Sequence, residues 1–106
     1  MTDKRIVLTT SNSKDEAQKI AHHLVENQLA ACVNIVPHIL SVYRWQSKVE
    51  SNDEWLLLIK TTSEKFPAVR DAIRELHSYE LPECISIAID NGSPEYLQWV
   101  GESVGS

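Results

Sequence analysis

The longest apolar feature of the chain lies between residues 29 and 61 and has two limbs. The first limb, Val33 to Trp45, is dense in β-branched and aromatic residues, which fit the pleated surface of a strand. A polar stretch at 46–53 contains the turn, and the second limb, residues 55–59, is an unbroken apolar run. The pattern predicts an antiparallel hairpin that is long for a small domain.

Two features of this hairpin bear on what covers it. Pro37 lies inside the first limb and has no N–H to donate, so it indicates an edge position or a bulge. Residues 55–59 do not alternate between apolar and polar, as a strand covered on one face only would do. Helices on one face of a small sheet leave the other face bare. We therefore expect a second copy of the chain to cover that face.

Shorter elements flank the hairpin. The predicted elements are a strand at 4–10, a helix from Ser13 to Gln28, a helix from Phe66 to His77, a strand at 85–89 and a final helix from Ser93. Ser13 and Glu16 have the spacing of a capping box at the first helix. The order predicts one α+β domain over 1–106 with a ferredoxin-like βαββαβ fold, which is an antiparallel sheet with helices on one face, an extended central hairpin and a C-terminal helix.

Composition narrows the functional classes. The chain has 106 residues with a hydrophobic share of 42%, which suits one globular domain with its own core. No apolar run approaches the roughly 20 residues of a membrane helix, and no leader is visible, so we expect a cytoplasmic location. Ten basic against fifteen acidic residues give a net charge of −5, which disfavours nucleic acid and membrane as partners. Cys32 and Cys84, the only cysteines, are expected to be free thiols.

The chain contains no phosphate-binding glycine loop, nucleophile elbow or zinc-protease motif, so we do not expect an enzyme. The densest group of polar side chains that could line a pocket between subunits comprises Lys60, His77, Tyr79, Glu80 and Glu83. An amine, an imidazole, a phenol and carboxylates at strand ends suit such a pocket. The alternative is an ion-paired contact between subunits.

Five segments of the chain together resemble one known family. They are AACVNIVP at 30–37, SVYRWQSKVE at 41–50, LLLIKT at 56–61, LHSYELPE at 76–83 and GSPEYLQW at 92–99, and they resemble the CutA family of divalent-cation tolerance proteins. The resemblance implies a ferredoxin-like fold in a tight homotrimer, similar to the PII signalling proteins, whose hairpin arms wrap neighbouring subunits. Ser47 departs from the family, since many members have glycine at this turn position.

The same resemblance implies a role in tolerance of copper and other divalent ions. Cys32 and His77 match positions of the family, and Glu83 could complete a weak metal site, with copper or another divalent cation as the ligand and no obligatory cofactor. Thr9 and Leu76 stand where some members have a cysteine and a second histidine. The Cys and His ligands that copper prefers are therefore incomplete in this chain.

Large side chains on the hairpin and the last helix are the expected trimer contacts. They are Tyr43, Trp45, Trp55, Leu57 and Trp99. An exposed tryptophan on an arm more often anchors an interface than it holds a ligand.

Three functional hypotheses follow. The first is a non-catalytic homotrimer with a metal or small-molecule site between subunits. The second is a PII-like signalling trimer that presents its hairpin to a protein partner and has no physiological metal role. The third is an enzyme with an active site between subunits, in which Lys60, His77, Tyr79 and Glu83 are the candidates for acid–base work.

Overall fold

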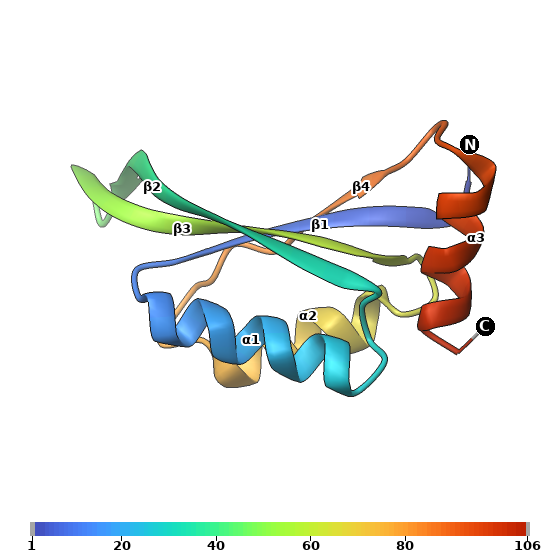
Figure 1. The fold of residues 1–106 in the computed structure, drawn as a ribbon. Helices are drawn as coiled ribbons and strands as arrows, with labels where there is room; N and C mark the ends of the chain where they lie inside the picture. The colour runs from blue at the N-terminus through green and yellow to red at the C-terminus, as the bar shows by residue number, and fades with distance from the viewer. Residues whose placement is uncertain (1, 106) are drawn as a thin grey trace.

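The computed structural model describes residues 2–105 and confirms the predicted order of elements. The elements are β1 (Lys4–Ser11), α1 (Lys14–Glu26), β2 (Cys32–Trp45), β3 (Lys48–Thr62), α2 (Phe66–Leu76), β4 (Ile85–Ala88) and α3 (Pro94–Ser103). The strands form one antiparallel sheet in the order β2-β3-β1-β4, and α1 and α2 lie against one face of it (Figure 1). The helix α3 packs against β1 and β3 at the end of the sheet where β1 begins (Figure 1). The ferredoxin-like α+β prediction is confirmed. Within residues 2–105, no helix has the length and apolar character needed to cross a membrane.

The predicted long hairpin is formed by β2 and β3 and carries the expected irregularity at Pro37. The register changes between Val36 and Ile39, so Pro37 and His38 together oppose Trp55, which is a β-bulge. At the tip, Gln46 and Ser47 have φ of 50° and 68°, the positive values that a two-residue type I′ turn requires. A glycine would adopt this conformation at lower steric cost than Ser47 does.

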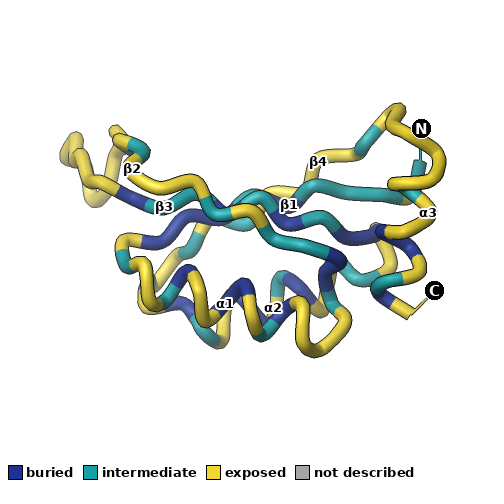
Figure 2. Tube along the Cα trace, viewed as in Figure 1, coloured by how far each residue is buried: buried dark blue, intermediate teal, exposed yellow. Residues whose placement is uncertain are grey.

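The core lies between the sheet and the two helices (Figure 2). On β3, Leu57 and Ile59 point toward the helices and are fully buried with Val7 of β1. The partners from the helices include Leu24 and Ile73, which are also fully buried. Leu57 is therefore a core residue of its own subunit. The prediction that it is a trimer contact is wrong, because the core already takes its whole side chain.

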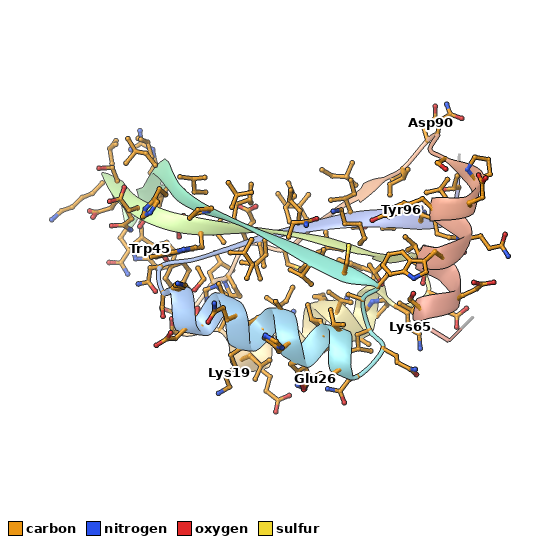
Figure 3. All side chains as sticks on the ribbon, viewed as in Figure 1. Lys19, Glu26, Trp45, Lys65, Asp90 and Tyr96 are labelled. Atoms are coloured by element: carbon orange, nitrogen blue, oxygen red, sulfur yellow. The ribbon has the colours of Figure 1, made fainter. Side chains whose placement is uncertain are left out.

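The other face of the sheet is largely apolar, and none of the helices within residues 2–105 covers its middle (Figures 1 and 3). The register places a row of apolar side chains on this open sheet face, among them Ile6, Leu8, Val36, Leu56, Leu58, Ile85 and Ile87. Ile85 and Ile87 of β4 are 50% and 46% exposed. The unbroken run at 55–59 is thus explained, since alternate residues of one strand face the core and the open sheet face.

Candidate functional site

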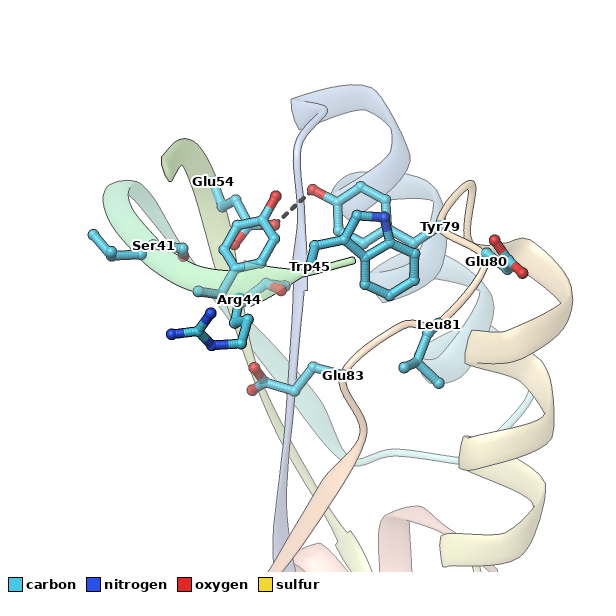
Figure 4. Close-up of a pocket in the computed structure, with 11 residues that line it drawn as sticks. Ser41, Arg44, Trp45, Glu54, Tyr79, Glu80, Leu81 and Glu83 are labelled. Carbon is cyan, nitrogen blue, oxygen red and sulfur yellow. Dashed lines mark hydrogen bonds between the residues drawn. The ribbon is translucent and has the colours of Figure 1, made fainter. Parts of the chain in front are cut away.

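A cleft of about 650 Å³ opens between the hairpin arm and the segment that follows α2 (Figure 4). Residues 41–45 of β2 form one wall, and the segment 79–83 forms the other. Thr10 of β1 and Glu54 of β3 also line the cleft. The cleft therefore depends on the long hairpin, whose arm extends past the helices and faces the loop after α2.

The carboxylate of Glu54 is enclosed in this cleft, and the residue is only 4% exposed. The hydroxyl of Tyr79 donates a hydrogen bond of 2.6 Å to Oε2 of Glu54 (Figure 4). Burial and this bond to a carboxylate raise the pKa of Tyr79 above its ordinary value. Tyr79 therefore remains a hydrogen-bond donor at physiological pH.

Glu83 brings a second carboxylate to the same cleft. Partial loss of hydration in the cleft raises the pKa of Glu83, although the residue as a whole is exposed, and the negative charge of Glu54 raises it further. Arg44 also lines the cleft, yet among residues 2–105 no basic side chain lies within ion-pair distance of Glu54 or Glu83. The two carboxylates thus have no ion-pair partner among the described residues, although Arg44 lines the same cleft.

His77 fixes the segment that carries Tyr79. Its ring is fully buried, and Nδ1 accepts a hydrogen bond of 3.0 Å from the backbone N–H of Tyr79. Because Nδ1 accepts, Nε2 carries the proton and donates to the carbonyl oxygen of Thr10 at 2.5 Å. The rings of His77 and Tyr79 are also packed together, with centroids 4.6 Å apart. Both nitrogens of His77 are therefore occupied inside the chain, and neither is available to a metal ion.

Glu16 of α1 holds the same segment from the other side. Its carboxylate accepts hydrogen bonds from the hydroxyl of Ser11 at 2.7 Å and from the backbone N–H of Ser78 at 2.9 Å. Ser13 caps the N–H of Glu16 as predicted, but the carboxylate does not complete the capping box, because it joins β1 to the end of α2. Burial opposes its ionisation, but these hydrogen bonds and the nearby His77 hold the pKa of Glu16 below its ordinary value.

Replacing Glu16 by glutamine is expected to lower the free energy of unfolding at pH 7 by about 1.5 kcal/mol, because two hydrogen bonds to a charged group are weakened. The pKa of Glu16 in the folded chain lies below the ordinary 4.5. The ionised carboxylate therefore adds stability above that pH, and this contribution is lost as the pH falls through the folded-state pKa. The free energy of unfolding, measured with urea, should fall less steeply between pH 7 and pH 3 for Glu16→Gln than for the wild type. The exposed control Glu64→Gln should keep the wild-type slope, and equal slopes for all three proteins would contradict this role of Glu16.

Comparison with known proteins decides the family of the chain. The family model described as "CutA1 divalent ion tolerance protein" matches residues 5–103. The chain belongs to the CutA1 family. The CutA resemblance predicted from the five sequence segments is thereby confirmed.

Relatives from distant organisms share the whole fold. The divalent-cation tolerance protein CutA of Thermus thermophilus is 46% identical over 102 residues, which cover 96% of this chain and 99% of the relative. Its solved structure superposes with a TM-score of 0.94. The structure titled periplasmic divalent cation tolerance protein CutA, from Archaeoglobus fulgidus, is 42% identical, with a TM-score of 0.92 and coverage of 95% and 98%. Human Protein CutA is 45% identical over 88% of this chain, which spans only 51% of the human protein.

The structure separates the three CutA1 residues that were predicted as metal ligands. Cys32 begins β2, opposite Lys60, and its Sγ lies 3.5 Å from the hydroxyl of Tyr96 on α3. His77 and Glu83 lie toward the other end of the sheet, near Thr10 and the cleft. Within residues 2–105, no group of three His, Cys, Asp or Glu side chains is arranged to hold a metal ion. The predicted Cys32–His77–Glu83 set therefore does not form a site within one chain.

The predicted pocket is only partly assembled within the chain. Tyr79, Glu80 and Glu83 line the cleft, while His77 lies behind it. Lys60 donates to the side chain of Asn34 near the beginning of β2 and is not part of the cleft. Glu54 was missed, and its only signal in the sequence is an acidic residue at the border of the apolar run 55–59.

The remaining aromatic residues predicted as trimer contacts have different surroundings. Tyr43 and Trp45 line the cleft. Trp55 is half-buried against the core, with its ring 6.0 Å from that of His38. Trp99 of α3 is exposed beside Tyr96.

Proposed function

We propose that this chain acts as a non-catalytic homotrimer in the tolerance of divalent metal ions. The observation that carries the assembly is the open sheet face, a largely apolar surface that a monomer would leave in contact with water. A second and a third copy would bury it, and the extended hairpin arms could reach neighbouring subunits. A cytoplasmic location remains a prediction, because the names of relatives include a periplasmic and a chloroplastic protein.

The cleft supports a hard divalent cation better than copper. Copper prefers cysteine and histidine ligands, but Cys32 is remote from the cleft and both nitrogens of His77 are occupied. Glu54 and Glu83 offer carboxylate oxygens, which suit a hard ion that keeps several of its own water molecules. We therefore propose weak binding of a hydrated divalent ion at these two residues.

A second candidate function is supported by the hairpin tip. Leu40, Val42 and Val49 are strongly exposed apolar residues on the arm. A signalling trimer that docks a protein partner through this arm would use them directly. Loss of a partner on truncation of residues 46–53 would favour this function.

Titration with Mn²⁺ tests the metal proposal. We expect one saturable site per chain with a dissociation constant on the order of 1 mM, and loss of that site in the double variant Glu54→Gln/Glu83→Gln. The matched control Glu26→Gln/Glu64→Gln should bind like the wild type. Calorimetry measures the affinity of each protein for Mn²⁺, and paramagnetic broadening of the Tyr79 resonances shows whether the ion binds in the cleft. Undiminished binding in the cleft variant, or tighter Cu²⁺ binding that Cys32→Ser abolishes, would overturn the proposed site.

A further inference from the structure

The size of the cleft is matched to a small organic molecule. A volume of about 650 Å³ lies within the range of sites that enclose small organic ligands. A metal ion with its bound water would fill only part of this space. Two hydrophobic side chains, Val42 and Leu81, line the cleft and are largely exposed in the chain. The cleft therefore has apolar surface that a bare ion would leave uncovered.

The walls of the cleft carry three aromatic rings from two separate elements. Tyr43 and Trp45 extend from β2, and Tyr79 comes from the segment after α2. In Figure 4 the indole of Trp45 reaches from the hairpin toward the segment that holds Tyr79 and Leu81. The faces of such rings attract cations as well as apolar groups. The indole of Trp45 offers no oxygen to a hard metal ion, and the hydroxyls of Tyr79 and Tyr43 are already hydrogen-bonded to Glu54 and Asn52. The three rings suit the apolar body of a charged organic ligand.

The charged side chains of the cleft indicate the sign of the charge that a ligand would carry. Three carboxylates, Glu54, Glu80 and Glu83, line it against one guanidinium, Arg44. Glu54 is the most enclosed of them, and among residues 2–105 its two oxygens receive one hydrogen bond, from Tyr79. The second oxygen of Glu54 has no partner among the described residues and is open to the cleft, where a cation or a further donor can reach it. The free oxygen of Glu54 and the neighbouring Glu83 therefore favour a positively charged donor.

From these observations we propose that the cleft binds an organic ammonium ion, a primary amine with an apolar body. Its three N–H donors would be shared between the free oxygen of Glu54 and the carboxylate of Glu83. Its body would lie against Trp45, Tyr79 and Leu81. The proposal shares the carboxylate pair with the proposed metal function, and the ammonium ion and the metal ion would compete for it.

Three probes with the same phenyl ring separate charge from apolar contact. Phenethylammonium carries the cation, 2-phenylethanol is its neutral analogue, and 3-phenylpropionate is an anion. With the full chain at neutral pH, phenethylammonium should saturate one site per chain and shift the resonances of Trp45 and Tyr79. The neutral alcohol should bind about tenfold more weakly, because it lacks the charge-assisted hydrogen bonds, and the anion should not bind.

Substitutions of cleft residues test which side chains contribute to the binding of phenethylammonium. Glu54→Gln keeps an acceptor for Tyr79 and should weaken phenethylammonium about tenfold, since it removes the charge alone. Trp45→Leu, on the exposed arm, tests the aromatic wall without touching the core and should weaken binding about fivefold. The control Glu64→Gln should leave the affinity unchanged. Thermal unfolding of each variant confirms that the fold is retained.

The outcomes separate this inference from the proposed function. If Mn²⁺ displaces the bound amine, both the ammonium ligand and the metal function are supported. If the amine binds and no Mn²⁺ site is found, the ammonium ligand is supported and the metal function is overturned. Saturable Mn²⁺ binding with no response to phenethylammonium overturns the ammonium ligand and leaves the metal function in place. Equal affinity for the amine and the neutral alcohol also overturns it, since the carboxylates would then contribute nothing.

Discussion

Leu58→Glu is expected to abolish assembly at micromolar concentration, so that the protein sediments near the 12.0 kDa of one chain instead of three times that mass. Leu58 lies on the open sheet face, directly opposite Leu8 of β1 and Asn34 of β2. In the proposed trimer each copy would bring one new carboxylate into an apolar interface. An unpaired charge in such a place costs several kcal/mol, which is enough to dissociate a complex.

The control for this experiment is Val25→Glu. Val25 is an exposed apolar residue of α1, on the opposite side of the sheet from the open face, so its replacement should leave the mass unchanged. A milder variant, Leu58→Ala, guards against simple misfolding and should shift the concentration at which subunits dissociate. Circular dichroism reports the retained secondary structure in each case. A trimer of unchanged stability in Leu58→Glu would contradict the role proposed for the open sheet face.

The fold was predictable because local and periodic signals agree along the chain. Ser13 caps α1, and the β-branched limb around Pro37 forms a strand with a bulge, as the sequence predicted. The start of α2 has a comparable local signal, since Pro67 lies in its first turn. Each of these signals acts within a few residues and follows from the backbone chemistry of the residue itself. The packing of two helices on one face then follows from the order of the elements.

The candidate site was predicted only in part, because it depends on which ends of the elements meet. The apolar run of the second limb ends before Lys60, and Tyr79 follows the predicted second helix, so the sequence pattern placed them together. The 11 residues of α2 advance the chain by about 16 Å and return it toward Thr10, away from Lys60. Glu54 joins the site through a contact with Tyr79, a residue 25 positions away. No local pattern encodes such a contact.

The buried structural role of His77 could not be predicted from the sequence either. A histidine after the last turn of a helix is compatible with exposure, with a charge at the helix end or with metal binding. The structure encloses its ring between β1, α1 and the following segment, with Thr10, Glu16 and Tyr79 as neighbours. Its two nitrogens hold the loop in place. The residue that best matched a metal ligand in sequence thus positions one wall of the cleft.

Leu57→Ala is expected to produce the opposite result to Leu58→Glu, although the two residues are adjacent. Leu57 is fully buried between the sheet and the helices, beside Val7 and Ile59. Removal of its terminal isopropyl group leaves a cavity in the core, which costs about 2–5 kcal/mol. The open sheet face keeps all of its side chains, so the mass in sedimentation should remain that of the wild type.

Urea unfolding of Leu57→Ala and the wild type must be compared at one protein concentration, because the stability of an oligomer depends on it. The midpoint should fall sharply for Leu57→Ala while the subunits remain associated in native buffer. For Leu58→Ala, by contrast, the midpoint should depend more steeply on protein concentration than in the wild type. If Leu57→Ala dissociates without a loss of subunit stability, Leu57 is a contact between subunits and not a core residue. The alternation along β3 would then fail to separate the core from the surface that joins the subunits.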